Sequence, residues 1–141
     1  MTRSMTTTTS TAPRDALATT QLSVVSLPVA DQERALRFYV DVLGFTVVAD
    51  APFDGLRWLQ LAPRGGGSSI ALVTWFEQMP AGSVQGLVLG TDDVHGDAAG
   101  LRERGLELAD PVEEFFGTHT SFTDPDGNGW LLLQEPAGAT G

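Results

Sequence analysis

The chain has 141 residues, which is enough for one domain or two very small ones. Its 42% hydrophobic and 18% charged residues are typical of a folded globular protein, and its formal charge of −10 argues against nucleic-acid binding. There is no Cys and no Lys, which excludes disulfides, thiolate chemistry and Schiff-base catalysis, and two histidines, His95 and His119, are too few for a three-His metal site.

The first 20 residues are rich in Thr and lack the apolar stretch of a secretory signal. We therefore expect residues 1–20 to be a disordered leader, with Met1 or Met5 as the true start. No apolar run approaches the roughly 20 residues that a membrane span requires, so a cytoplasmic location without membrane contact is expected. Residues 136–141 are expected to form a flexible tail.

The first half of the chain predicts the order strand, helix, strand, strand, strand. Asp31 is a typical N-cap for residues 32–43, in which apolar side chains recur at helical spacing, and Gly44 is a stop signal after that helix. Turn residues separate the strand-like runs of this half, which are residues 22–29, 45–49, 56–61 and 69–76.

The second half repeats this order. Asp92 or Asp93 caps a helix that ends before Gly105, and the strand-like runs are residues 87–89, 106–108, 118–123 and 130–134. Asp31 and Gly44 are 13 residues apart, as are Asp92 and Gly105, which indicates a duplication with a period of about 61 residues.

These elements predict an α+β fold. A single domain over residues 21–135 contains two tandem βαβββ modules, residues 21–80 and 83–135. We expect the two sheets to form a curved, cupped mixed sheet with the helices outside, because a sheet covered on one side leaves its other face open. Such a trough is suited to holding a ligand.

Two segments resemble a known family, the vicinal oxygen chelate superfamily, which includes glyoxalase I, bleomycin-resistance proteins, fosfomycin-resistance enzymes and extradiol dioxygenases. Residues 28–45, PVADQERALRFYVDVLGF, resemble the start of these proteins, and residues 122–135, FTDPDGNGWLLLQE, resemble the hairpin that closes their second module. In the DPDGN turn, Asp124 and Asp126 are expected to accept hydrogen bonds from local backbone amides, and Gly127 is expected to have a positive φ.

The resemblance also implies four metal-ligand positions, two in each module. In this chain they are occupied by Val24, Ala71, Gly86 (next to Gln85) and Leu131, none of which carries a donor atom on its side chain. We therefore expect the family's metal site to be absent, and no other cofactor is expected. This departure argues against glyoxalase, dioxygenase and fosfomycin-type metal chemistry.

Alternation along the strands predicts what the trough offers instead. Val24, Ala71 and Leu131 are expected to line it, and Ser121 and His119 point inward if Phe122 packs against a helix. Several aromatic residues are expected at the rim, where they stack against a hydrophobic or aromatic ligand; they are Phe53, Trp58, Trp75, Phe76, Phe115 and Phe116. The alternative is that these aromatics belong to the core or to a module interface.

His119 is the catalytic candidate, as the one histidine in a predicted strand, and Glu77 beside the aromatic loops is a second. The alternatives are a histidine bonded to the backbone and a solvated carboxylate. Two function classes therefore remain open. One is a binding protein that sequesters a drug, as bleomycin-resistance proteins do, and so gives antibiotic resistance. The other is a metal-independent lyase, isomerase or cyclase of secondary metabolism. The resemblance further implies a homodimer.

Overall fold

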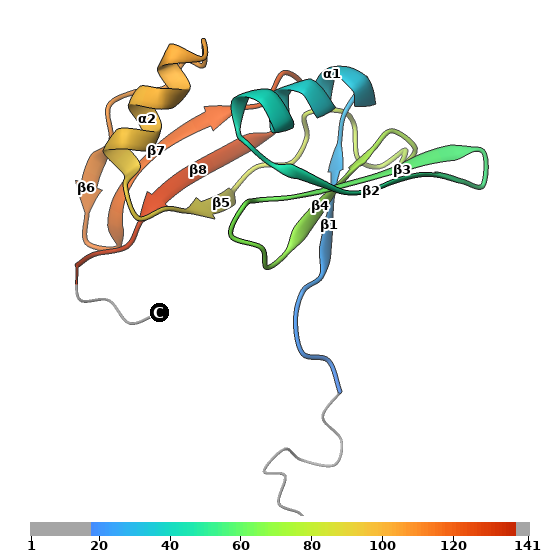
Figure 1. The fold of residues 1–141 in the computed structure, drawn as a ribbon, viewed down its shortest axis with the longest axis horizontal. Coiled ribbons are helices and arrows are strands. Elements are labelled where there is room, and N and C mark those ends of the chain that lie inside the picture. Colours follow the sequence, from blue (N-terminus) through green and yellow to red (C-terminus); the bar gives the residue numbers. More distant parts are fainter. Residues whose placement is uncertain (1–17, 138–141) are drawn as a thin grey trace, which may run out of the picture.

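The computed structural model describes residues 18–137, and two modules follow one another in the predicted order (Figure 1). Module one consists of β1 (Val24–Pro28), α1 (Gln32–Arg37), η1 (Phe38–Val42), β2 (Thr46–Phe53), β3 (Leu56–Ala62) and β4 (Ser69–Val73). Module two consists of β5 (Leu87–Gly90), α2 (Val94–Glu103), β6 (Val112–Glu114), β7 (Gly117–Thr123) and β8 (Gly129–Gln134). The predicted leader and tail lie largely outside the described residues.

Each module contains one four-stranded mixed sheet. The strand order is β1-β4-β3-β2 in module one and β5-β8-β7-β6 in module two, with β1 parallel to β4 and β5 parallel to β8. The helix in each module connects its first strand to the antiparallel hairpins, and both helices lie on the same side of the molecule (Figure 1). The predicted α+β fold with two βαβββ modules is therefore confirmed.

The helical segment of module one is one residue longer than that of module two, and a π-helical turn accommodates the extra residue. Asp31 caps α1 by accepting hydrogen bonds from the amides of Glu33 and Arg34, whereas Asp93, not Asp92, caps α2. The cap therefore lies 13 residues before Gly44 in module one and 12 before Gly105 in module two. The extra residue is taken up in η1, where the Leu43 amide donates to the Phe38 carbonyl.

Three predicted strands differ in the structure. Residues 106–108 are not a strand, because Leu106 and Leu108 turn inward and pack against α2; the edge strand is β6, paired with β7. The strand predicted over residues 69–76 ends at Val73, where the parallel partner β1 also ends. β2 extends beyond the predicted Ala49 to Phe53, with a bulge between Val47 and Ala49.

One apolar core joins the two modules. Leu27, Ile70 and Leu72 face Ala35 and Tyr39 on the helix side of module one, and Phe122 and Trp130 of module two belong to the same cluster. The Trp130 ring lies 5.9 Å from the ring of Tyr39, 6.1 Å from Phe45 and 6.4 Å from Phe122. Aromatic side chains thus bury much of the contact between the modules, and Trp130 and Leu132 face the helices as predicted.

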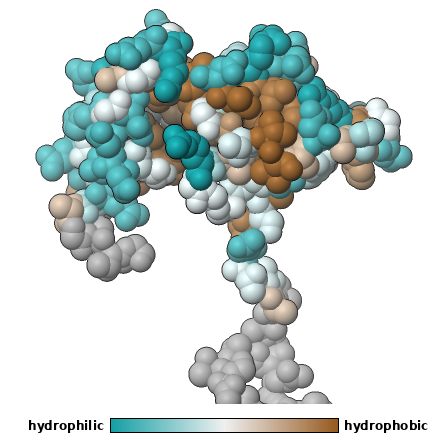
Figure 2. Space-filling view, in the orientation of Figure 1, coloured by the Kyte–Doolittle hydropathy of each residue, from teal (hydrophilic) through white to brown (hydrophobic). Residues whose placement is uncertain are grey.

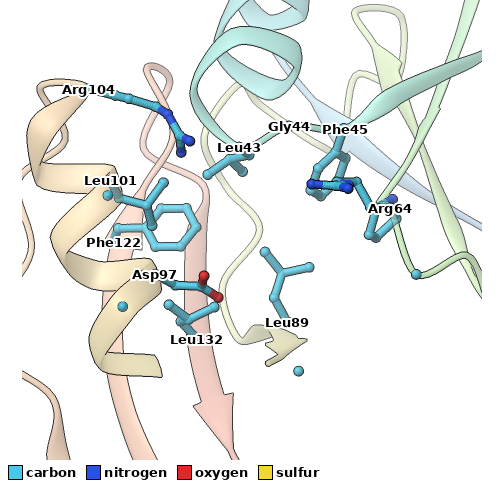
Figure 3. A pocket seen from close by; sticks show the side chains of 15 residues that line it. Leu43, Gly44, Phe45, Arg64, Leu89, Asp97, Leu101, Arg104, Phe122 and Leu132 are labelled. Atoms are coloured by element: carbon cyan, nitrogen blue, oxygen red, sulfur yellow. The ribbon is translucent and has the colours of Figure 1, made fainter. Parts of the chain in front are cut away.

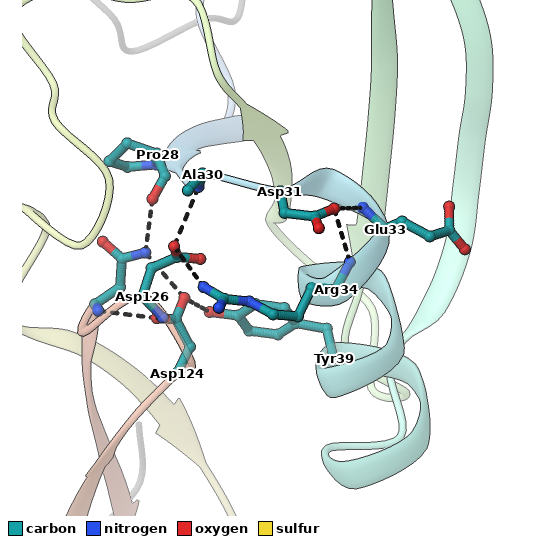
Figure 4. Close-up of polar contacts among 9 residues, drawn as sticks. Pro28, Ala30, Asp31, Glu33, Arg34, Tyr39, Asp124 and Asp126 are labelled. Carbon is teal, nitrogen blue, oxygen red and sulfur yellow. Dashed lines mark hydrogen bonds and ion pairs between the residues drawn. The ribbon is translucent and has the colours of Figure 1, made fainter.

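A polar network in the same region connects the β7–β8 turn to module one; we call this contact the latch (Figure 4). The Asp124 carboxylate accepts hydrogen bonds from the Tyr39 hydroxyl at 2.7 Å and from the backbone amides of Asp126 and Asn128 at 2.9 Å. Asn128 Nδ2 donates to the same carboxylate and to the carbonyl of Pro28. The latch therefore connects residues that are 85 and 100 positions apart in the chain.

Asp126 behaves differently from the prediction. Instead of bonding its own turn, it accepts from the amide of Ala30 at 3.1 Å and from the guanidinium of Arg34 at 2.9 Å. Both partners lie at the start of module one, so this carboxylate also serves the latch. Gly127 has the predicted positive φ, 102°. Burial, together with the negative charge of Asp124, raises the pKa of the Tyr39 hydroxyl, which therefore stays a donor at physiological pH.

The β2–β3 hairpin carries a second polar cluster, and it predicts a pH dependence. Arg57 donates two hydrogen bonds to Asp50, at 2.9 and 2.8 Å, and these lower the pKa of that carboxyl below its ordinary 3.8. A carboxyl with a lowered pKa in the folded state stabilises the fold above its unfolded-state pKa, and this contribution disappears as the pH falls through the folded-state value. We expect the urea midpoint of the wild type to exceed that of Arg57→Met at pH 6, and the two to converge by about pH 2. A constant difference down to acid pH would contradict this assignment.

Candidate functional site

Each sheet has one face away from the helices, and we call these two surfaces the open faces. On the open face of module one, β1, β3 and β4 bring together Val24, Ser26, Trp58, Gln60, Ser69 and Ala71. A chain of hydrogen bonds crosses this surface: Trp58 Nε1 donates to Gln60 Oε1 at 3.0 Å, and Gln60 Nε2 donates to Ser69 Oγ at 2.7 Å. These bonds hold the indole of Trp58 in one orientation.

Gln60 is a site residue that the sequence reasoning missed. The alternation in β3 carries the signal, because Leu59 and Leu61 are fully buried in the core while Trp58 and Gln60 are half-buried on the other face. Gln60 lies directly opposite Ala71, which is 0% exposed. A ligand on this face therefore meets Trp58 and Gln60 first, and reaches Ala71 only if the side chains around it move.

The open face of module two is more apolar and more exposed. Val88, Leu131 and Ser121 form one row across β5, β8 and β7, and Leu133 and His119 belong to the next. Val88 is 53% exposed and Ser121 is also exposed. Because Phe122 packs into the core on the other side of β7, His119 and Ser121 point away from the helices as expected.

The imidazole of His119 is held by its neighbours on this face. Its ring stacks on Phe116, with centroids 5.1 Å apart and planes inclined by 19°. Its Nε2 lies 3.7 Å from a carboxylate oxygen of Glu114, is itself buried, and has no hydrogen-bond partner among the described residues. Sequence reasoning found His119 but not Glu114 as its companion, since the pairing depends on the short turn between β6 and β7.

The rim aromatics form three separate pairs. Phe53 contacts Trp58 with ring centroids 6.2 Å apart, Trp75 contacts Phe76 at 6.0 Å, and Phe115 contacts Phe116 at 5.3 Å. Phe115 is 93% exposed. The β2–β3 hairpin and β6 lie at opposite ends of the molecule (Figure 1), so the pairs at Phe53 and Phe115 do not line one cavity within a single chain. Glu77 is exposed beyond β4, next to Phe76.

The four positions at which the family resemblance implies metal ligands carry no donor side chain. Val24, Ala71 and Leu131 lie on the open faces, and Gly86 precedes β5. Within residues 18–137, no three His, Cys, Asp or Glu side chains come together in an arrangement that holds a metal ion.

Exposed apolar side chains gather on the sheets. Val47, Val48 and Phe53 are about half exposed on β2, and Val112 is 52% exposed on β6. Figure 2 shows an apolar area in the middle of the visible face, with the surface hollowed beside it toward α2. In the described part of the chain, no helix has both the length and the apolar character needed to span a bilayer.

Comparison with known proteins gives a consistent picture. Residues 21–132 match the family model described as the Glyoxalase/Bleomycin resistance protein/Dioxygenase superfamily. The structure is similar to that of TnmS3, described as an antibiotic binding protein from Streptomyces sp. CB03234. The TM-score is 0.83 and the identity 45%, over 86% of this chain and 100% of that one.

Two further relatives extend the comparison. A glyoxalase/bleomycin resistance protein from the same Streptomyces strain is 47% identical over 81% of this chain and 100% of its own, with a TM-score of 0.76. The uncharacterized protein YetH of Bacillus subtilis is 33% identical over 119 residues, which are 81% of this chain and 98% of YetH.

Proposed function

Because the chain belongs to the glyoxalase/bleomycin resistance protein/dioxygenase superfamily, we propose that it binds an aromatic or otherwise apolar small molecule without altering it. The 45% identity to TnmS3, an antibiotic binding protein, is the strongest support, since the match covers that protein entirely. A fold alone does not determine function, so the chemistry of the open faces has to support binding as well. By this proposal, sequestration of the molecule gives resistance to it.

The chemistry of the open faces supports binding. Trp58 offers an oriented indole beside the amide of Gln60, and module two offers Val88, Leu131 and Ser121. Apolar walls with a few fixed polar groups are typical of small-molecule sites. At two of the positions where the family resemblance implies metal ligands, Val24 and Leu131 instead offer hydrocarbon side chains on the open faces, and Ala71, at a third, is fully buried.

A homodimer is part of this proposal. The aromatic pairs at Phe53 and Phe115 lie at opposite ends of one chain, and both are exposed. In a two-fold dimer, the open face of module one of one chain meets that of module two of the other, which brings the pairs to one cavity. Light scattering is expected to give twice the mass of the chain, and a monomer at micromolar concentration would contradict this part.

Catalysis is the second candidate, and one observation favours it. His119 Nε2 is buried without a hydrogen-bond partner among the described residues, 3.7 Å from Glu114. An imidazole beside a carboxylate is a pair of groups that general acid–base catalysis uses, so His119 is the residue on which a metal-independent lyase, isomerase or cyclase would depend.

One experiment tests binding and separates it from catalysis. Calorimetric titration with doxorubicin, ethidium and bleomycin is expected to give a Kd below about 10 µM for at least one of them. Ser121→Arg, which places a long cation on the open face, is expected to weaken that binding at least about tenfold. Ala99→Arg is the matched control, since it also adds one positive charge at a neutral, exposed position, on α2. Absence of binding across the panel, or equal binding by Ser121→Arg, would contradict the proposal.

Chromatography and mass spectrometry of the bound drug then distinguish the two functions. Sequestration returns the drug unchanged. A product that forms with the wild type and not with His119→Ala would instead establish the enzyme.

A further inference from the structure

A cleft of about 380 Å³ lies between the modules on the helix side, away from both open faces (Figure 3). We call it the inter-module cleft. Its floor consists of Leu89, Phe122 and Leu132 from the sheet of module two. Its walls are α2, the β3–β4 turn, and residues 43–45 of module one. Its volume is within the range of small-molecule pockets.

The duplication explains why this space is open. At the latch, the β7–β8 turn meets the helix of module one, and Tyr39, Asp124 and Trp130 fill that contact. The corresponding β3–β4 turn of module one lies across the cleft from α2, and it consists of Pro63, Arg64, three glycines and Ser68. α2 also contributes Gly100, where an added Cβ would meet no atom within 4 Å. No side chain therefore takes the place that the aromatic and polar network takes at the latch.

Two arginines give the cleft its charge. The guanidinium groups of Arg64 and Arg104 point toward the space from opposite walls (Figure 3). Arg104 donates one hydrogen bond to the carbonyl of Val42, and neither arginine forms a salt bridge within residues 18–137. Asp97 also lies at the cleft, where its carboxylate accepts a hydrogen bond from the hydroxyl of Thr91. The chain as a whole carries a net charge of −10, so two cations beside an apolar floor favour an anionic ligand at this one place.

We propose that the inter-module cleft is a second ligand site, which binds a small organic anion with an apolar ring body. The partly buried side chains of Leu43 and Leu89 contact the body beside the buried rings of Phe45 and Phe122, and the anionic group lies between Arg64 and Arg104. Asp97 disfavours a second negative charge on the ligand, which restricts the site to monoanions. This inference does not depend on what the open faces bind.

The test uses a matched pair of fluorescent probes. Anilinonaphthalene sulfonate is an apolar monoanion, and N-phenyl-1-naphthylamine is its analogue without the sulfonate. We expect Arg64→Met and Arg104→Met each to weaken binding of the sulfonate at least about tenfold, and to leave the neutral probe within about twofold. Arg37→Met is the matched control, because Arg37 is an exposed arginine of α1 outside the cleft.

Gly100→Phe tests the position of the site. It places a ring in the open space at Gly100 and is expected to weaken both probes at least about tenfold, while circular dichroism shows an intact fold. Sulfonate binding that survives Gly100→Phe would overturn the proposal. An equal loss of both probes in the arginine variants would overturn the role of charge.

Discussion

Asp124→Ala is expected to lower the free energy of unfolding by about 3–5 kcal/mol, because it removes the acceptor at the centre of the latch. Asp124 is 4% exposed, and its carboxylate accepts from the hydroxyl of Tyr39, from Asn128 Nδ2 and from two backbone amides. The loss of this carboxylate leaves several buried donors without a partner. Since native domains are stable by only about 5–15 kcal/mol, the variant is expected to melt at least about 10 °C lower.

Two variants show whether the effect comes from the network. Tyr39→Phe removes only the hydroxyl, which donates to Asp124 and accepts from Trp130 Nε1 at 2.9 Å, and is expected to lose about 1–3 kcal/mol. A double-mutant cycle between Tyr39 and Asp124 is expected to show coupling of at least about 0.5 kcal/mol. Additive effects, measured by urea denaturation, would mean that the two side chains act independently.

Gly82→Ala is expected to destabilise the protein by about 3 kcal/mol or more, as a backbone clash at the same latch. A Cβ at Gly82 would lie 1.9 Å from the carbonyl oxygen of Asp126, and the φ of Gly82 is +82°. The atom in the way is backbone, so it is not relieved by a side-chain rotation. The Gly82 amide also donates to the carbonyl of Pro28, and this bond is expected to break when the loop moves.

Gly100→Ala is the matched control for Gly82→Ala. Gly100 lies inside α2, has no positive φ, and has open space where the methyl group would go. Alanine is a better helix former than glycine, so this variant is expected to gain about 0.5–1 kcal/mol in thermal or urea unfolding. Equal losses from both substitutions would show that close approach at Gly82 is not the cause.

The latch also bears on the candidate site. Because Asp126 binds Ala30 and Arg34, and Asp124 binds Tyr39, the sheet of module two is fixed against the helix of module one. The latch therefore contributes to the orientation of the two open faces relative to one another. A latch variant that still folds is expected to weaken ligand binding through the orientation of these faces, without contact between Asp124 and the ligand.

The sequence by itself determined the duplicated βαβββ order, the helix signals at Asp31, Gly44 and Gly105, and the faces on which Leu131 and Trp130 lie. These features depend on local spacing: strand alternation, N-capping, and glycine after a helix act within a few residues.

Only the tertiary structure decided which distant groups meet. It showed that Asp126 bonds module one and not its own turn, that Glu114 approaches His119, and that Gln60 reaches Ser69. It also showed the inter-module cleft at Gly100. The contacts of Asp126 arise from how the two modules pack, over chain separations of about 100 residues, and no local pattern encodes them. The contacts of Glu114 with His119 and of Gln60 with Ser69 lie within one module, and they depend on the register of adjacent strands, which only the folded sheets show.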